Sequence, residues 1–163
     1  MNSINQPQSV KSILRTLTII HMAFCVSIVL FGTVVLYITK NAILDFADTS
    51  DKLFYIVPGL AIAGALASQY LFKKTIIQAH SKSTLKEKLM QYQSSKFIQF
   101  ALIEAPAFLG IVNFLITSNQ YYLIISAALL VYLISRKPTK FEIKNSLNLN
   151  PEQEREFIKA IRN

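Results

Sequence analysis

Four long apolar runs, separated by short polar segments, dominate the pattern of this chain. The runs extend from Leu17 to Thr39, from Phe54 to Phe72, from Phe97 to Thr117 and from Tyr121 to Ser135. Their apolar residues are gathered together rather than spaced with the period of a strand or an amphipathic helix. An apolar helix of about 20 residues is long enough to cross the hydrocarbon core of a bilayer. The pattern therefore predicts an all-α membrane protein with four transmembrane helices.

Two polar segments between the runs carry local helix signals. The stretch AILDFA within residues 40–53 is expected to lie as a short interfacial helix. In the lysine-rich segment of residues 73–96, Thr84 and Glu87 have the spacing of a capping box. The third helix is thus expected to begin near Leu85, outside the membrane and ahead of its apolar run.

A polar tail follows the fourth run. This run is short for an average bilayer, so we expect either local thinning or a helix that continues into the tail. Asn150 followed by Pro151 is a good helix start and predicts a short cytoplasmic helix over about residues 151–162. The expected domains are a four-helix transmembrane domain over residues 1–137 and a cytoplasmic tail over residues 138–163.

The charges are placed as in a protein that crosses a membrane. The chain has a net charge of +8, but its basic residues flank the apolar runs and form no nucleic-acid-binding motif. Of the 17 lysines and arginines, all but Lys40 and Lys52 lie in the amino end, in residues 73–96 or in the tail. The positive-inside rule then places these three segments and both termini in the cytoplasm. The lysine run reads as an orientation signal and a solvated face, and no nucleic acid is expected as a partner.

Composition narrows the class further. Hydrophobic residues make up 52% and charged residues 16% of the chain, whereas an average soluble domain is about 25% charged. The single cysteine, Cys25, excludes a disulfide framework, and no metal-ligand spacing occurs. Nucleophile elbow, HExxH and P-loop motifs are absent from the sequence. We therefore expect no cofactor, no metal and no enzymatic activity.

Small residues in the runs indicate close helix packing. All 4 glycines lie inside the apolar runs, as is common in membrane helices. In the second run small residues recur every four positions, a pattern that lets helix backbones approach closely. The expected helix-packing residues are Gly59, Ala63, Gly64, Ala67, Ser68 and Gly110.

An internal repeat brings polar residues of different runs into register. Residues 20–31 match residues 103–114 at several positions, so the chain is expected to form two tandem hairpins in the same orientation. The alignment pairs His21 with Glu104, at similar depth in the cytoplasmic leaflet. Ser68 and Gln69 fall in the same layer. The candidate intramembrane polar site therefore consists of His21, Ser68, Gln69 and Glu104.

Two interpretations of Glu104 are open. In the structural one, the carboxyl is neutral or paired with His21 and fixes the helix register. In the functional one, it binds a proton, a cation or an amine headgroup, with His21 as relay. Pro106 is expected to kink the same helix, because it removes the helical donor of the Leu102 carbonyl.

Several motifs carry a resemblance to a known family. They are LTIIH in the first helix, KSTLKEKL before the third, ALIEAPAF within it and RKPT at the start of the tail. With them the chain resembles a family of small uncharacterised bacterial four-helix integral membrane proteins. The resemblance implies a bacterial inner membrane and no assigned activity.

Two functions remain as hypotheses. The first is a non-enzymatic accessory or scaffold subunit that packs in the lipid bilayer against a membrane-protein partner or a second copy. It rests on the short polar segments and the small-residue helix faces. The alternative is a small proton- or cation-coupled carrier that uses Glu104 and His21, as an oligomer because four helices are few for a carrier.

Overall fold

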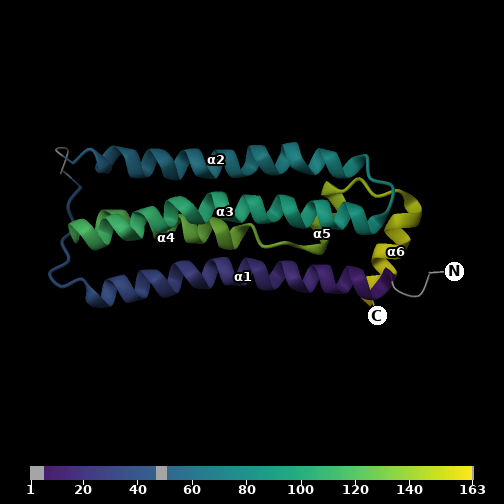
Figure 1. Cartoon of the computed structure of the whole chain (residues 1–163), viewed down its shortest axis with the longest axis horizontal. Coiled ribbons are helices and arrows are strands. Elements are labelled where there is room, and N and C mark those ends of the chain that lie inside the picture. Colours follow the sequence, from purple (N-terminus) through teal and green to yellow (C-terminus); the bar gives the residue numbers. More distant parts are fainter. Residues whose placement is uncertain (1–5, 47–50, 163) are drawn as a thin grey trace. The chain divides into compact units, whose positions relative to one another are not determined.

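Six α-helices make up the computed structural model of the chain, which describes residues 6–46 and 51–162 (Figure 1). In chain order they are α1 (Gln6–Ile38), α2 (Leu53–His80), α3 (Leu85–Thr117), α4 (Gln120–Ser135), α5 (Lys140–Ser146) and α6 (Pro151–Arg162). Within these ranges no strand is formed, and one isolated bridge joins Ile43 to Asn119. The chain is all-helical, as its apolar pattern predicts.

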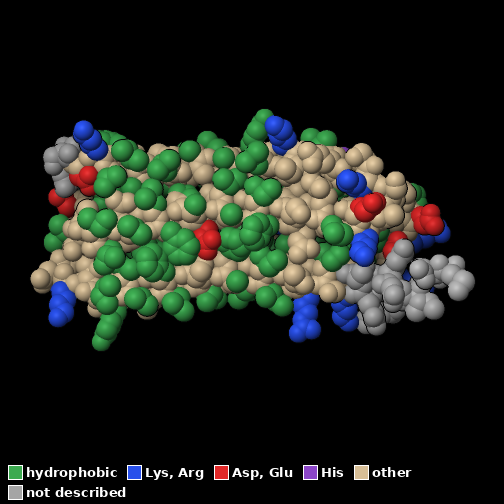
Figure 2. Space-filling view, viewed as in Figure 1, with side chains coloured by type: hydrophobic (Ala, Val, Ile, Leu, Met, Phe, Trp, Pro, Cys, Tyr) green, Lys and Arg blue, Asp and Glu red, His purple; other side chains and the backbone are tan. Residues whose placement is uncertain are grey.

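Three of the helices in the described part of the chain are long and apolar enough to cross a membrane, namely α1, α2 and α3. The count rises to four if α4 and α5, which are bent by 75° relative to each other, form one span. By itself α4 has 16 residues and ends at Ser135, so it does not continue into the tail. On the face drawn in Figure 2, apolar side chains (green) are spread over the helices and charged ones (blue and red) are sparse.

The segment of residues 73–96 is mostly helical. α2 continues to His80, and only residues 81–84 separate it from α3. The predicted capping box is present at the start of α3. The backbone N–H of Glu87 donates to Thr84 Oγ1, and the backbone N–H of Thr84 donates to the Glu87 carboxylate, both at 3.2 Å. This local signal explains why the start of α3 at Leu85 could be predicted.

The predicted interfacial helix at AILDFA is wrong for residues 42–46, which are not helical; Ala47 lies outside the described residues. Here the backbone pairs with the connection between α3 and α4 instead. The N–H of Ile43 donates to the Ser118 carbonyl at 2.9 Å, and its carbonyl accepts from the Gln120 N–H at 2.8 Å. The Asn119 side chain both donates to and accepts from the Asp45 backbone. These bonds replace the helical ones that AILDFA would have made.

The helices form two compact units, each described by itself. The tail unit comprises residues 1–21, 70–99 and 137–163, and the α4 unit comprises residues 22–69 and 100–136. The largest buried side chains of the tail unit are Leu17, Leu89, Tyr92, Lys96, Ile143 and Leu147. Those of the α4 unit are Phe100, Ile103, Ile111, Phe114, Tyr122 and Leu133.

Glycine permits close helix contacts in the α4 unit. A Cβ atom on Gly110 of α3 would lie 2.2 Å from Ser126 Oγ and 2.9 Å from the Tyr122 carbonyl, both in α4. On α2, a Cβ on Gly64 would lie 2.7 Å from the Leu102 carbonyl of α3. A Cβ on Gly59, by contrast, would meet nothing within 4 Å. The contacts of the α4 unit thus need glycine at positions 64 and 110 but not at position 59.

Gly110→Ala is expected to lower the free energy of unfolding in detergent by about 1–3 kcal/mol, because the added methyl overlaps a backbone carbonyl that cannot rotate away. Gly59→Ala is the matched control and should leave the unfolding temperature unchanged. Thermal unfolding followed by circular dichroism measures both. Equal effects of the two substitutions would contradict the close contact between α3 and α4.

Candidate functional site

Glu104 is half-buried in the α4 unit and has a partner on α1. Ser27 Oγ donates to Glu104 Oε1 at 2.5 Å, and the same hydroxyl lies 2.8 Å from the Phe24 carbonyl. Phe24 in turn packs on Phe100 of α3, with ring centroids 5.9 Å apart. The carboxyl therefore joins α1 to α3 through a hydrogen bond set within an aromatic contact. Sequence analysis did not name Ser27 as this partner.

Pro106 lies on another face of α3. Its Cγ would be 3.0 Å from a Cβ on Gly64, so α2 packs against the proline ring. Pro106 has no N–H to donate to the carbonyl of Leu102. This carbonyl is directed at the same glycine. The missing side chain of Gly64 lets its backbone approach this carbonyl, where Cα–H groups are weak donors. Glu104 and Pro106 thus contact different helices.

Gln69 has partners of its own on α4. Its Nε2 donates to the Tyr132 hydroxyl at 2.7 Å, and the guanidinium carbon of Arg136 lies 4.6 Å from the centroid of the Tyr132 ring. The neighbouring Ser68 is buried and donates to the Ala65 carbonyl of its own helix. Ser68 and Gln69 are therefore bound elsewhere than to the Glu104 carboxyl.

His21, the fourth residue of the predicted site, belongs to the tail unit. Its side chain is only 2% exposed. The pairing of His21 with Glu104 stays a prediction. Within the described residues, no group of three or more His, Cys, Asp and Glu side chains is placed to hold a metal ion. Glu104 and Gln69 thus have their partners on neighbouring helices, and Ser68 has its partner within α2.

The tail unit contains a buried cation that sequence analysis did not single out. Lys96 of α3 has a fully buried side chain. Its Nζ lies 2.6 Å from Glu142 Oε1 of α5 and donates to Gln99 Oε1 at 3.0 Å. The same Nζ lies 4.8 Å from the ring centroid of Phe72 and 5.8 Å from that of Tyr92. One ammonium thus contacts α2, α3 and α5.

The surroundings of Lys96 explain how the charge is tolerated. Removing an ammonium from water costs several kcal/mol, which a counter-charge and further hydrogen bonds must offset. Glu142 supplies the counter-charge from the first turn of α5, where Thr139 caps the helix and accepts from the Glu142 N–H at 3.1 Å. The Glu142 side chain is 31% exposed. Within the ion pair, the Lys96 side chain is therefore shielded from solvent, whereas the Glu142 side chain is partly accessible to it.

Further polar contacts fasten the tail to α2, to α3 and to the turn between them. Lys88 Nζ donates to the Asn148 carbonyl at 3.0 Å, and His80 Nε2 donates to the Ser146 carbonyl at 2.9 Å. Gln153 of α6 donates to the Ser83 carbonyl at 3.0 Å. These bonds attach α5, α6 and their connection to one end of the α2–α3 hairpin.

The sequence interpretation of residues 73–96 as a solvated lysine run is wrong for two of its members. Lys88 and Lys96 are 5% and 0% exposed, whereas the side chains of Lys73, Lys74, Lys82 and Lys86 are exposed. A helical wheel started at Leu85 would have separated them, because positions 88 and 96 share a face with the buried Leu89 and Tyr92. The burial of Lys88 and Lys96 could therefore have been predicted from the sequence of a helix that begins at Leu85.

Comparisons with known proteins give no match to any family model, any curated protein or any solved structure. The resemblance to small bacterial four-helix membrane proteins stays a prediction.

Glu142→Gln is expected to lower the free energy of unfolding by about 3 kcal/mol, because it leaves the Lys96 ammonium buried without its counter-charge. Adding Lys96→Met to this variant should recover most of the loss, since no buried charge then remains. Glu154→Gln is the control. It breaks the exposed pair with Lys144 and should cost about 1 kcal/mol or less. Denaturant unfolding in detergent measures all three, and a similar loss for Glu142→Gln and Glu154→Gln would refute the role assigned to burial.

Proposed function

We propose that the chain is a multi-pass protein of a bacterial inner membrane that acts as a non-enzymatic accessory or scaffold subunit. Its four crossings form two tandem hairpins, with both termini and the lysine-rich turn in the cytoplasm. The distribution of basic residues supports this orientation. The apolar surface of the long helices supports placement in a bilayer.

One observation carries the scaffold function: α2 leaves a small-residue face without a partner inside the described chain. Gly59 borders open space and Ala63 is exposed. Gly64 and Ser68, on a neighbouring face of the same helix, pack inside the α4 unit. Only 17% of the residues in the most apolar part of α2 are buried, against 44% for α3. Lipid alone needs no glycine and alanine at helical spacing, whereas a second helix that crosses closely does.

The internal contacts of the polar residues point the same way. Glu104, Gln69 and Lys96 each bind a neighbouring helix. Polar contacts between membrane helices contribute roughly 0.6–2 kcal/mol each and set the register in which helices pack. The polar residues then hold the helices of each unit in register, and the outer apolar faces receive the partner.

Ala63→Leu is expected to abolish association with the partner without lowering the stability of the chain itself. The added side chain fills the space into which another helix would pack, while it points away from the α4 unit. Native purification in mild detergent should recover a defined membrane protein, or a second copy, at a fixed ratio with the unmodified chain and not with Ala63→Leu.

The matched control is Ala128→Leu, the same change at an exposed position of α4. It should leave the association intact. A monodisperse monomer from the unmodified chain, or the same loss with both variants, would refute a binding role for the Gly59–Ala63 face.

A proton- or cation-coupled carrier is the second candidate. It is favoured by the half-exposed Glu104 carboxyl, which keeps a solvent- or lipid-facing side while Ser27 binds one of its oxygens. Flux through reconstituted protein that Glu104→Gln abolishes without loss of expression would establish the carrier. Under the scaffold function, Glu104→Gln changes no flux and lowers stability by about 2 kcal/mol or less.

A further inference from the structure

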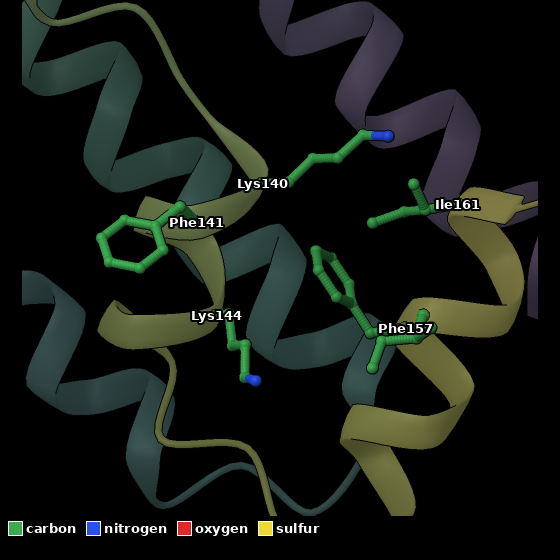
Figure 3. A pocket seen from close by; sticks show the side chains of 6 residues that line it. Lys140, Phe141, Lys144, Phe157 and Ile161 are labelled. Carbon is green, nitrogen blue, oxygen red and sulfur yellow. The ribbon is translucent and has the colours of Figure 1, made fainter.

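Two adjoining grooves in the tail unit share a basic rim and an apolar lining. The first has a volume of about 430 Å³ and lies between α5 and α6 (Figure 3). It is lined by Lys140, Phe141, Lys144, Phe157, Ile158 and Ile161. The second has a volume of about 350 Å³ and is lined by Lys11, Leu14, Arg15, Thr18, Lys140 and Ile161. Lys140 and Ile161 belong to both, so the grooves meet beside the first turns of α1.

The lining combines exposed apolar groups with cations. Phe141 is 76% and Ile158 51% exposed, although aromatic and branched apolar side chains normally avoid water. Figure 3 shows the Phe157 ring between the side chains of Lys140 and Lys144, which line the same groove. Among the residues that the structure describes, no acidic one lines either groove. The surface therefore complements a ligand that is anionic at one end and apolar at the other.

The charges differ in what they already bind. Lys144 forms an ion pair with Glu154, so its charge is largely compensated. Arg15 and Lys140 are both exposed. Arginine binds phosphate through a planar pair of N–H groups, and lysine adds a mobile point charge. Arg15 and Lys140 are the residues best suited to hold a phosphate group at the junction of the grooves.

The depth of the grooves fits a lipid headgroup. Leu14 and Thr18 flank the place where α1 changes from polar residues to its apolar run, which begins at Leu17. Lys140 follows the end of α4 by five residues, since α4 ends at Ser135. Given the membrane placement proposed above, both segments lie at the headgroup level of the cytoplasmic leaflet, where acidic lipids attract basic groups.

We propose that the two grooves form one binding site for an anionic phospholipid of the surrounding membrane. The phosphate pairs with Arg15 and Lys140. The apolar side chains of Leu14, Phe141 and Ile161 contact the glycerol backbone and the first part of the acyl chains. Burial of these side chains against the lipid removes the exposed apolar surface that the isolated chain shows. A free phosphate ion would leave that surface in water.

The test uses the full chain in detergent and counts bound lipids by native mass spectrometry. Phosphatidylglycerol, which carries a net negative charge, is compared with phosphatidylcholine of the same acyl chains, which does not. The variant is Arg15→Gln with Lys140→Gln. It removes two exposed charges, and at the first position of α5 a neutral side chain is at least as compatible with the helix dipole as a lysine. The control is Lys73→Gln with Lys74→Gln, which removes two exposed lysines that line neither groove.

One phosphatidylglycerol per chain is expected to bind at least ten times more tightly than phosphatidylcholine. The Arg15→Gln, Lys140→Gln variant should weaken this binding by about 10- to 30-fold, since each basic group near an anionic lipid contributes on the order of 1 kcal/mol. The Lys73→Gln, Lys74→Gln control should change it less than twofold. Inorganic phosphate at the same concentration should not displace the lipid.

Three results would overturn the proposal. The first is an equal loss in both variants, which would mean unspecific attraction to positive charge. The second is displacement by inorganic phosphate, which would mean an anion site without a lipid. The third is a stable dimer in which phosphatidylglycerol no longer binds, which would mean that a second copy occupies the grooves. A dimer formed through the grooves would persist in Ala63→Leu, whereas one formed through the Gly59–Ala63 face would not, so the two proposals fail separately.

Discussion

Hydrocarbon offers no hydrogen bonds, so a polar group in an apolar helix must find its partner within the protein. This constraint accounts for the contacts of the α4 unit. Ser126 donates to the Ala107 carbonyl of the neighbouring helix at 2.8 Å, and Gly110 makes room for that approach. The carbonyl that Pro106 deprives of its donor is directed at Gly64. The small residues therefore let the helices approach to the distances at which the polar groups can form hydrogen bonds.

The tail unit meets the same constraint with a full charge. Lys96 stands one residue before the third apolar run, at the point where an ammonium leaves water for the interior of the protein. Its interactions with Glu142, Gln99, Phe72 and Tyr92 replace the lost hydration. Because Glu142 belongs to α5, the requirement of one lysine also positions the tail. The grooves beside α5 and α6 exist in this form because the tail is held there.

Much of the fold could be predicted because its signals are local. Apolar runs, the Thr84–Glu87 capping box and the Asn150–Pro151 start depend on neighbouring residues alone, and the helix starts near Leu85 and Pro151 followed from them. The errors concern partners distant in sequence. Residues 42–46 are not helical because Ile43 pairs with the connection at residues 118–120, and Lys96 is buried because Glu142 lies opposite it. The hydrogen bond between Ser27 and Glu104 could not be predicted, because a single serine in an apolar run does not indicate which residue it binds.

We propose that hydrocarbon surrounds the long helices, with the lysine-rich turn and the tail on one side of the membrane. Labelling of single cysteines by a membrane-impermeant maleimide, in a Cys25→Ser background, tests this directly. Lys40→Cys and Gln120→Cys should be labelled in intact cells, whereas Ser81→Cys and Asn145→Cys should be labelled only after the membrane is opened. Labelling of Ser81→Cys and Asn145→Cys from opposite sides, or of all four positions in a soluble fraction, would contradict the account.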